Sequence, residues 1–76
     1  MMMFSIEFIR QLPGRDEPEV IDIHSAEAAS LGEVIHRADL SLRTAGFRVR
    51  PECFRIRVGS GPIIFQSRSP AAARRA

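Results

Sequence analysis

Apolar and polar residues alternate in several segments of this chain, and the alternation predicts β-strands. Four segments rich in aromatic or β-branched residues follow this pattern: residues 4–10, 19–24, 53–58 and 63–66. A period of two places alternate side chains on opposite faces, as in a half-buried strand. In the first segment Phe4, Ile6 and Phe8 therefore point one way, and in the second we expect Ile21 and Ile23 to share one side.

Between the second and third segments the period changes to that of a helix. Apolar residues recur there at intervals of three and four positions: Ala28, Leu31, Ile35, Ala38, Leu42 and Ala45. This spacing gives a helix one apolar face. We expect Ser25 to be its N-cap residue and Gly46 to follow its last turn. Two pairs at i,i+4 spacing support the same helix, Glu33 with Arg37 and Asp39 with Arg43.

The element order β-β-α-β-β predicts an α+β domain of two layers over residues 1–67. One helix covers one face of a four-stranded, mainly antiparallel sheet. Residues 68–76 have no apolar periodicity and are expected to be disordered. We favour a sheet in which the first strand lies between the second and the third, because this order places Glu7 beside Arg55 and Arg57. A parallel pairing of the second and third strands, with the helix as the crossover, is the alternative.

The sheet face without the helix is expected to carry both apolar and charged residues. By alternation it holds Ile9, Val20 and Ile64 among Glu7, Asp22, Arg55, Arg57 and Gln66. A domain this small buries only about 60 % of the surface that its unfolded chain exposes. With one cysteine, Cys53, the chain has no internal disulfide to compensate. We therefore expect a second copy to bind this face or a sheet edge, with Ile9, Val20 and Ile64 as the contact residues.

The arginines raise the alternative of a nucleic-acid partner. All eleven basic residues are arginine, and lysine, asparagine, tyrosine and tryptophan are absent, a composition that GC-rich codons would produce. Residues 43–76 hold eight arginines and one acid, whereas residues 1–42 hold three arginines and eight acids. This asymmetry indicates either a basic binding surface or two parts of one sheet that attract each other. The formal net charge of +2 is too small to favour a polyanion. The candidate polyanion contacts are Arg43, Arg48, Arg50, Arg55 and Arg57.

Patterns that indicate catalysis or metal binding are sparse. Cys53, His24 and His36 are the candidate nucleophile and bases, but a Cys–His pair needs hydrogen-bond contact that their spacing does not establish. The chain has no C-x-x-C or H-x-x-x-H pattern. Gly59-Ser60-Gly61 reads as a hairpin turn and not as a phosphate loop before a helix. We therefore expect no enzymatic activity, no cofactor and no metal.

A few short motifs resemble those of a known group of proteins. The motifs are Asp16-Glu17, Glu27-Ala28-Ala29 and Phe54-Arg55-Ile56-Arg57-Val58. Their order resembles small alphaproteobacterial proteins that run from an aromatic strand through D-E-x-G and L-P-D-x-E-A-A into a helix and end on a W-x-I-x-V strand and one more. The resemblance spans residues 4–66 and departs at His24-Ser25 and at Phe54, which replaces the tryptophan. It implies a bacterial protein with the β-β-α-β-β fold and implies no chemistry, since that group has no established activity.

Taken together, the patterns favour a small, non-enzymatic, homo-oligomeric interaction protein that uses its open sheet face or a sheet edge. One cysteine and no long apolar run suit a location in the cytoplasm, with a homodimer as the simplest assembly and no membrane partner. The alternative is a nucleic-acid-binding accessory protein that uses the arginine-rich second half of the chain.

Overall fold

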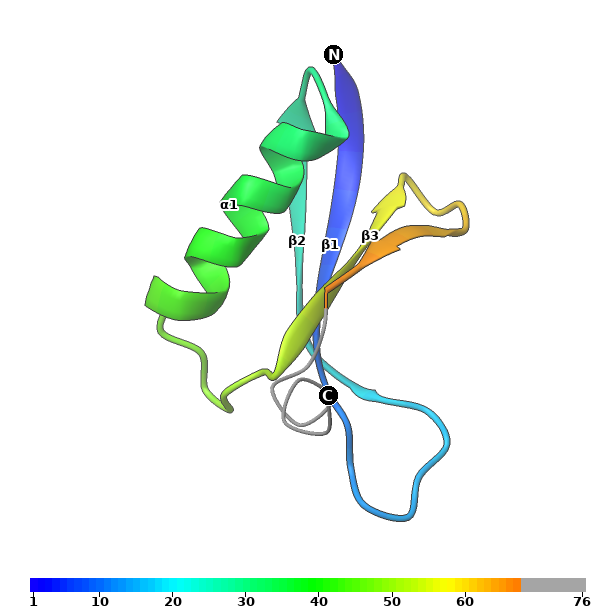
Figure 1. The fold of residues 1–76 in the computed structure, drawn as a ribbon, viewed down its shortest axis with the longest axis vertical. Helices are drawn as coiled ribbons and strands as arrows, with labels where there is room; N and C mark the ends of the chain where they lie inside the picture. Colours follow the sequence, from blue (N-terminus) through cyan, green and yellow to red (C-terminus); the bar gives the residue numbers. More distant parts are fainter. Residues whose placement is uncertain (68–76) are drawn as a thin grey trace.

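The computed structural model describes residues 1–67, which form one four-stranded sheet and one helix (Figure 1). The elements are β1 (Met2–Arg10), β2 (Glu19–Ala28), α1 (Leu31–Thr44), β3 (Cys53–Val58) and β4 (Ile63–Gln66). The sheet order is β2-β1-β3-β4, and every neighbouring pair is antiparallel. The predicted two-layer α+β fold and its strand order are confirmed, and the alternative parallel pairing of β2 with β3 is wrong. The predicted disorder of residues 68–76 concerns a part of the chain outside the described residues.

The core lies between α1 and the face of the sheet that α1 covers. Side chains of β1 and β3 supply most of it: Phe4, Ile6, Phe8, Phe54 and Ile56. From the helix, Val34 and Ala38 are completely buried, and Leu31, Ile35 and Leu42 pack around them. The predicted apolar face of the helix is correct from Leu31 to Leu42. It wrongly included Ala28, which ends β2, and it omitted Val34, the largest fully buried side chain of the helix.

The helix begins later than the sequence pattern predicted. Its N-cap is Ser30, whose hydroxyl accepts a hydrogen bond from the Glu33 amide at 3.3 Å. The Glu33 carboxylate in turn accepts from the Ala29 amide at 3.2 Å, so the two side chains satisfy donors at the start of the helix. Ser25 is not the N-cap, because β2 continues through it to Ala28 along the whole length of β1. The two predicted i,i+4 ion pairs are present, at 2.7 Å in the first and 2.9 Å in the second.

A bulge in the β1–β2 pairing changes which side chains of β2 face the helix. The register shifts between Phe8 and Ile9, so Phe8 lies opposite Asp22 while Ile9 lies opposite Val20. One extra residue in β2 reverses the alternation that an unbroken strand would keep. Asp22 therefore shares the helix-side face with Phe8, and Ile23 lies opposite Glu7 on the other face. The prediction that Asp22 belongs to the open face is wrong for this reason.

Candidate interaction surface

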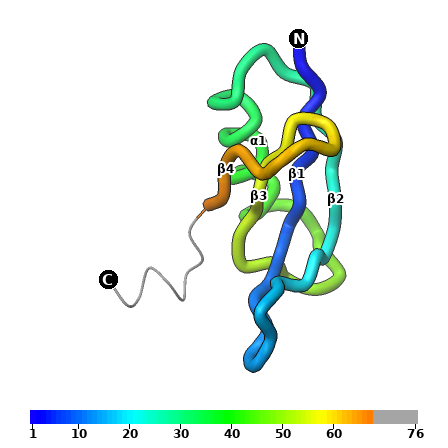
Figure 2. Tube along the Cα trace, turned by 90° about the vertical axis from the view of Figure 1, so that its right-hand side faces the viewer, coloured from blue at the N-terminus to red at the C-terminus, as the bar shows by residue number. Residues whose placement is uncertain are grey.

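No helix or strand of residues 1–67 covers the sheet face opposite α1, which is called the open face below. Figure 2 looks onto the molecule from this side, with β4, β3, β1 and β2 crossing the view in that order and the helix behind them. The register assigns to this face a set of residues from all four strands: Met3, Ser5, Glu7, Ile9, Val20, Ile23, Ser25, Glu27, Cys53, Arg55, Arg57, Ile63 and Gln66. A surface available to a partner would therefore include these side chains.

The centre of the open face is an ion-pair cluster formed by Glu7, Arg55 and Arg57, called the Glu7 triad. Glu7 lies directly opposite Arg55 across the β1–β3 ladder. One carboxylate oxygen of Glu7 accepts from Nε of Arg55, and the other accepts from Nε of Arg57 at 3.2 Å. Arg57 also donates to the Gly61 carbonyl at 3.0 Å, which ties the triad to the β3–β4 turn. The predicted proximity of Glu7 to the two arginines is confirmed.

Burial and charge act in opposite directions on the Glu7 carboxyl. Burial alone would raise the pKa of Glu7, but the hydrogen bonds and positive charges of Arg55 and Arg57 outweigh it and lower the pKa below the ordinary value of 4.5. The carboxylate is therefore held ionised between the two guanidinium groups. These two arginines have a structural role in the sheet, whatever else they contact.

Around the Glu7 triad, the open face carries exposed apolar side chains near both edges of the sheet. Ile23 on β2 is 55 % exposed, and Val20 on the same strand and Ile63 on β4 are each 40 % exposed. Of the three contact residues predicted from sequence, Val20 lies on this face and is accessible. Ile9 also lies on it but is only 1 % exposed, since it is packed within the chain opposite Cys53.

The third predicted contact residue lies at a second irregularity, in the β3–β4 pairing. Arg57 is opposite Ile63 and Ile56 is opposite Phe65, so Ile64 between them has no register partner. Its side chain is 43 % exposed. The sequence pattern assigned Ile64 to the open face by alternation, but a bulge residue does not follow the alternation of its strand. The register gives that position opposite Arg57 to Ile63.

The outer edge of β2 is the second part of the candidate surface. β2 is ten residues long, is the terminal strand of the sheet and pairs only with β1 within the described chain. Near its middle the Ile23 amide donates to Oδ1 of Asp22 at 2.9 Å, and Oδ2 of Asp22 lies 3.0 Å from Nε2 of His24. These contacts lower the pKa of Asp22, first through the His24 hydrogen bond and then through the Ile23 amide.

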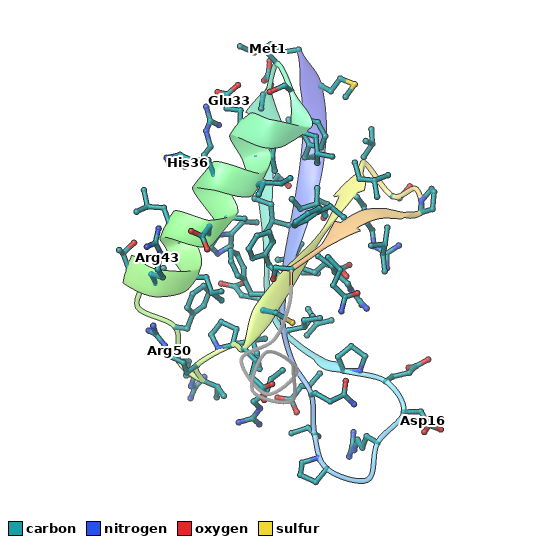
Figure 3. All side chains as sticks on the ribbon, viewed as in Figure 1. Met1, Asp16, Glu33, His36, Arg43 and Arg50 are labelled. Carbon is teal, nitrogen blue, oxygen red and sulfur yellow. The ribbon has the colours of Figure 1, made fainter. Side chains whose placement is uncertain are left out.

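The five arginines predicted as polyanion contacts do not lie together. Arg55 and Arg57 belong to the Glu7 triad on the open face. Arg43 pairs with Asp39 in the last turn of α1, and Figure 3 shows Arg43 and Arg50 at the C-terminal end of the helix and in the loop after it. Arg48 and Arg50 are exposed and form no ion pair with another described residue. The five candidate arginines therefore form two separate groups.

The candidate nucleophile and bases are also separated. Cys53 is buried opposite Ile9 on the open face, and burial followed by the charge of Glu52 raises the pKa of its thiol. His24 lies on the helix-side face, where its ring is 4.8 Å from that of Phe8. The sheet therefore stands between the Cys53 thiol and the His24 imidazole. Among residues 1–67, no three His, Cys, Asp or Glu side chains are grouped to hold a metal ion.

One shallow groove lies between α1 and β4, where the helix does not reach over the last strand. Its volume is about 600 Å³. It is lined by Gly32, Ile35, His36 and Asp39 from the helix and by Phe54, Phe65, Gln66 and Ser67 from the sheet. Figure 3 labels His36 on the helix, where it lines the rim of this groove. The groove thus combines an aromatic floor with a polar rim, and His36 is its one titratable base.

In the part of the chain that the structure describes, no helix combines the length and the apolar character needed to cross a membrane. Comparison with protein family models, with curated proteins and with solved structures finds no match to this chain. The resemblance to small alphaproteobacterial proteins therefore stays a prediction, and the functional argument depends on the geometry of the open face and of the β2 edge.

Proposed function

We propose that this protein is a small, non-enzymatic bacterial interaction protein that self-associates, in its simplest form as a cytoplasmic homodimer. The contact surface is formed by the open face and the outer edge of β2. One observation carries the proposal: Ile23, 55 % exposed, lies on the open face in the strand whose outer edge is unpaired. An exposed β-branched side chain beside an unpaired strand is a favourable position for another chain to bind.

The Glu7 triad supports a contact on this surface. A partner that covers charged groups leaves them without water, which is costly unless they already have partners. Here the Glu7 carboxylate is bonded to both guanidinium groups, and the three side chains are 13 %, 17 % and 26 % exposed in the order Glu7, Arg55 and Arg57. A second chain can therefore lie over this part of the sheet without stranding an unpaired carboxylate.

The size of the domain supports the same conclusion. The core of residues 1–67 is limited. Its ten buried apolar residues include only three from outside β1 and β3, which are Ala28, Val34 and Ala38. Small domains commonly gain the missing apolar burial by association. Self-association would cover Ile23 and Val20 and would increase the apolar area removed from water.

Size-exclusion chromatography with light scattering tests the proposal. The wild-type chain of 8.5 kDa is expected at twice that mass at both low and high salt, because an apolar contact is not screened. Ile23→Ser should shift the protein to the monomer mass. Leu40→Ser is the matched control, since Leu40 is 49 % exposed but lies on the helix, and it should leave the dimer intact. A monomeric wild-type chain at every concentration would refute the proposal.

The exposed loop arginines favour a second candidate function, contact with nucleic acid. Arg48 and Arg50 follow α1, are exposed and have no acidic partner among the described residues. Binding through them should weaken as salt rises, because phosphate contacts release counterions. Replacing both with glutamine should reduce the slope of log K against log salt by roughly 2. Absence of binding to DNA and RNA at low ionic strength would exclude this function.

A further inference from the structure

The two edges of the sheet differ in how well they can pair with another strand. β4 is four residues long, follows Pro62 and contains the irregularity at Ile64. Short length, a bulge and a nearby proline are features that protect an edge from pairing. β2 is ten residues long, and its register with β1 is unbroken from Asp22 to Ala28. The β2 edge is therefore the better template for a second strand.

The backbone direction along β2 follows from the hydrogen bonds of β1. The Gly59 amide donates to the Met3 carbonyl at 3.1 Å, which makes Met3 a residue whose backbone groups point toward β3. Since these directions alternate along a strand, Phe4, Ile6 and Phe8 point their amide and carbonyl groups toward β2. Their register partners there are Ala26, His24 and Asp22, which point back toward β1. The residues between them, Ile23 and Ser25, therefore point their backbone groups outward.

A side-chain contact supports the outward direction of the Ile23 amide independently. That amide donates to Oδ1 of the exposed Asp22 carboxylate at 2.9 Å and not to a carbonyl of β1. The donor at the middle of the free edge is thus occupied by a local side chain only. A strand from another chain can take the place of Asp22 by offering a carbonyl oxygen to the same amide.

We propose that two copies of this chain pair antiparallel through their β2 edges, about a twofold axis at Ile23, and so form one continuous eight-stranded sheet. This inference deepens the proposed function and depends on it. Antiparallel pairing sets outward-pointing residues opposite one another, and an axis at Ile23 meets this condition. An axis at His24 would also meet it, but it would set Asp22 opposite Ala26 of the partner subunit and not opposite His24. Ile23 then exchanges two backbone hydrogen bonds with Ile23 of the partner subunit. Both helices lie on the same side of the combined sheet.

Charge favours this register over its neighbours. With Ile23 on the axis, Asp22 lies opposite His24 of the partner subunit, and His24 lies opposite the partner's Asp22. These are non-hydrogen-bonded pairs, in which side chains come closest. The Asp22 carboxylate already lies 3.0 Å from its own His24, so the four groups form an alternating square of acids and imidazoles. With Ser25 on the axis instead, Ile23 would lie opposite Glu27 of the partner subunit, an apolar side chain against a charge.

The bulge in β2 also limits the proposed pairing to the central part of the strand, where the facing charges are opposite. The register about Ile23 would set Glu19 opposite Glu27 of the partner subunit if β2 were straight. The bulge adjoining Val20 bends the strand before that point. The paired segment is therefore short and central, and the like charges at its two ends are not forced together.

Disulfide trapping tests the register. In a Cys53→Ala background, Ile23→Cys places two thiols on the axis, where paired Cα atoms lie about 5.5 Å apart, within the range that a disulfide spans. Val20→Cys is the matched control, on the same strand and also exposed. Its two copies would be six residues apart along the pair, about 20 Å. We expect rapid oxidation to a covalent dimer for Ile23→Cys and at least a tenfold slower reaction for Val20→Cys.

The outcomes separate this inference from the proposed function. If light scattering shows a dimer in the Cys53→Ala background but Val20→Cys links as fast as Ile23→Cys, the β2–β2 register is refuted and the self-associating protein stands. If that background and the wild-type chain are both monomers at every concentration, both ideas are refuted. If Ile23→Cys alone links, and linking is lost on dilution below the concentration at which the dimer dissociates, the register is supported.

Discussion

Glu7→Gln is the substitution whose effect can be worked out most fully from the structure. The carboxylate is 13 % exposed and accepts from both Arg55, at 17 %, and Arg57, at 26 %. Glutamine keeps the shape and one acceptor oxygen but removes the negative charge. Two half-buried guanidinium groups then face each other without the anion that held them.

The expected decrease in the free energy of unfolding lies between two known limits. Removing one partner of a fully buried ion pair costs about 3–5 kcal/mol, and an exposed pair contributes about 0–1 kcal/mol. The Glu7 triad is nearer the buried limit, but water reaches both arginines, so we expect the free energy of unfolding to fall by about 2–3 kcal/mol. For a domain of this size each kcal/mol shifts Tm by about 4–8 °C, which predicts a decrease of about 10–20 °C.

Far-UV circular dichroism is the suitable assay, because the chain has no Trp or Tyr for fluorescence. Variants are compared at equal protein concentration, since self-association would itself raise Tm. Asp39→Asn is the matched control: it removes the acid of the Arg43 pair, whose side chains are 65 % and 52 % exposed, and should change stability by less than about 0.5 kcal/mol. An unchanged Tm for Glu7→Gln would show that the triad does not stabilise the sheet.

The same variant has a predicted dependence on pH. Because the pKa of Glu7 is lowered in the folded chain, its contribution is present above the unfolded value near 4.5 and is lost as pH falls through the folded pKa. The difference in stability between the wild-type chain and Glu7→Gln should therefore shrink as pH falls below 4.5. A difference that stays constant down to the lowest accessible pH would contradict this explanation.

Three further substitutions test the local structure by thermal or urea unfolding. Ser30→Ala should lower the free energy of unfolding by about 1 kcal/mol through loss of the helix N-cap. Ser25→Ala should change it by less than about 0.5 kcal/mol. A larger loss for Ser25→Ala than for Ser30→Ala would place the start of the helix at Ser25. Val34→Ala removes two buried methyl groups and should cost about 2 kcal/mol, against a negligible effect for the half-exposed Leu40→Ala. Gly59→Ala should cost about 1 kcal/mol, because the φ of Gly59 is +59°, and a neutral result would mean that the turn adopts another conformation.

Sequence periodicity predicted the sheet well where the strands are regular. The alternation of Phe4, Ile6 and Phe8 identified the buried face of β1, and opposite charges identified the pairing of Glu7 with the arginines of β3. Both inferences depend on short-range geometry that a regular strand fixes. The order of all four strands followed from that one electrostatic pairing.

The errors have specific structural causes. The bulge beside Val20 adds one residue to β2, and nothing in the letters E-V-I-D-I-H marks an extra residue; the side assigned to Ile23 was consequently reversed. The helix start was misplaced because Ser25 and Ser30 are both acceptable N-cap residues. The choice between Ser25 and Ser30 depends on the pairing of β1 with β2, which extends as far as Ala28. This pairing is a contact between residues far apart in the sequence.

The candidate surface was predicted only in outline. The sequence indicated a half-apolar open face, but it placed Ile23 on the side opposite Val20 and Asp22. Ile23 is in fact exposed on the open face, and Ile9 is buried. The free edge of β2 could not be recognised until the strand order was known. The complementarity of Asp22 and His24 about Ile23 depends in turn on the register that the bulge sets.

Amide hydrogen exchange at low and high protein concentration tests the central claim, the pairing of two β2 edges, most directly. The His24 amide points toward β1 and should be protected at both concentrations, whereas the Ile23 amide is held only by the exposed Asp22 side chain in a single chain. The account predicts that exchange at Ile23 slows toward that of His24 as the dimer forms. Rapid exchange at Ile23 in a sample that light scattering shows to be fully dimeric would contradict it.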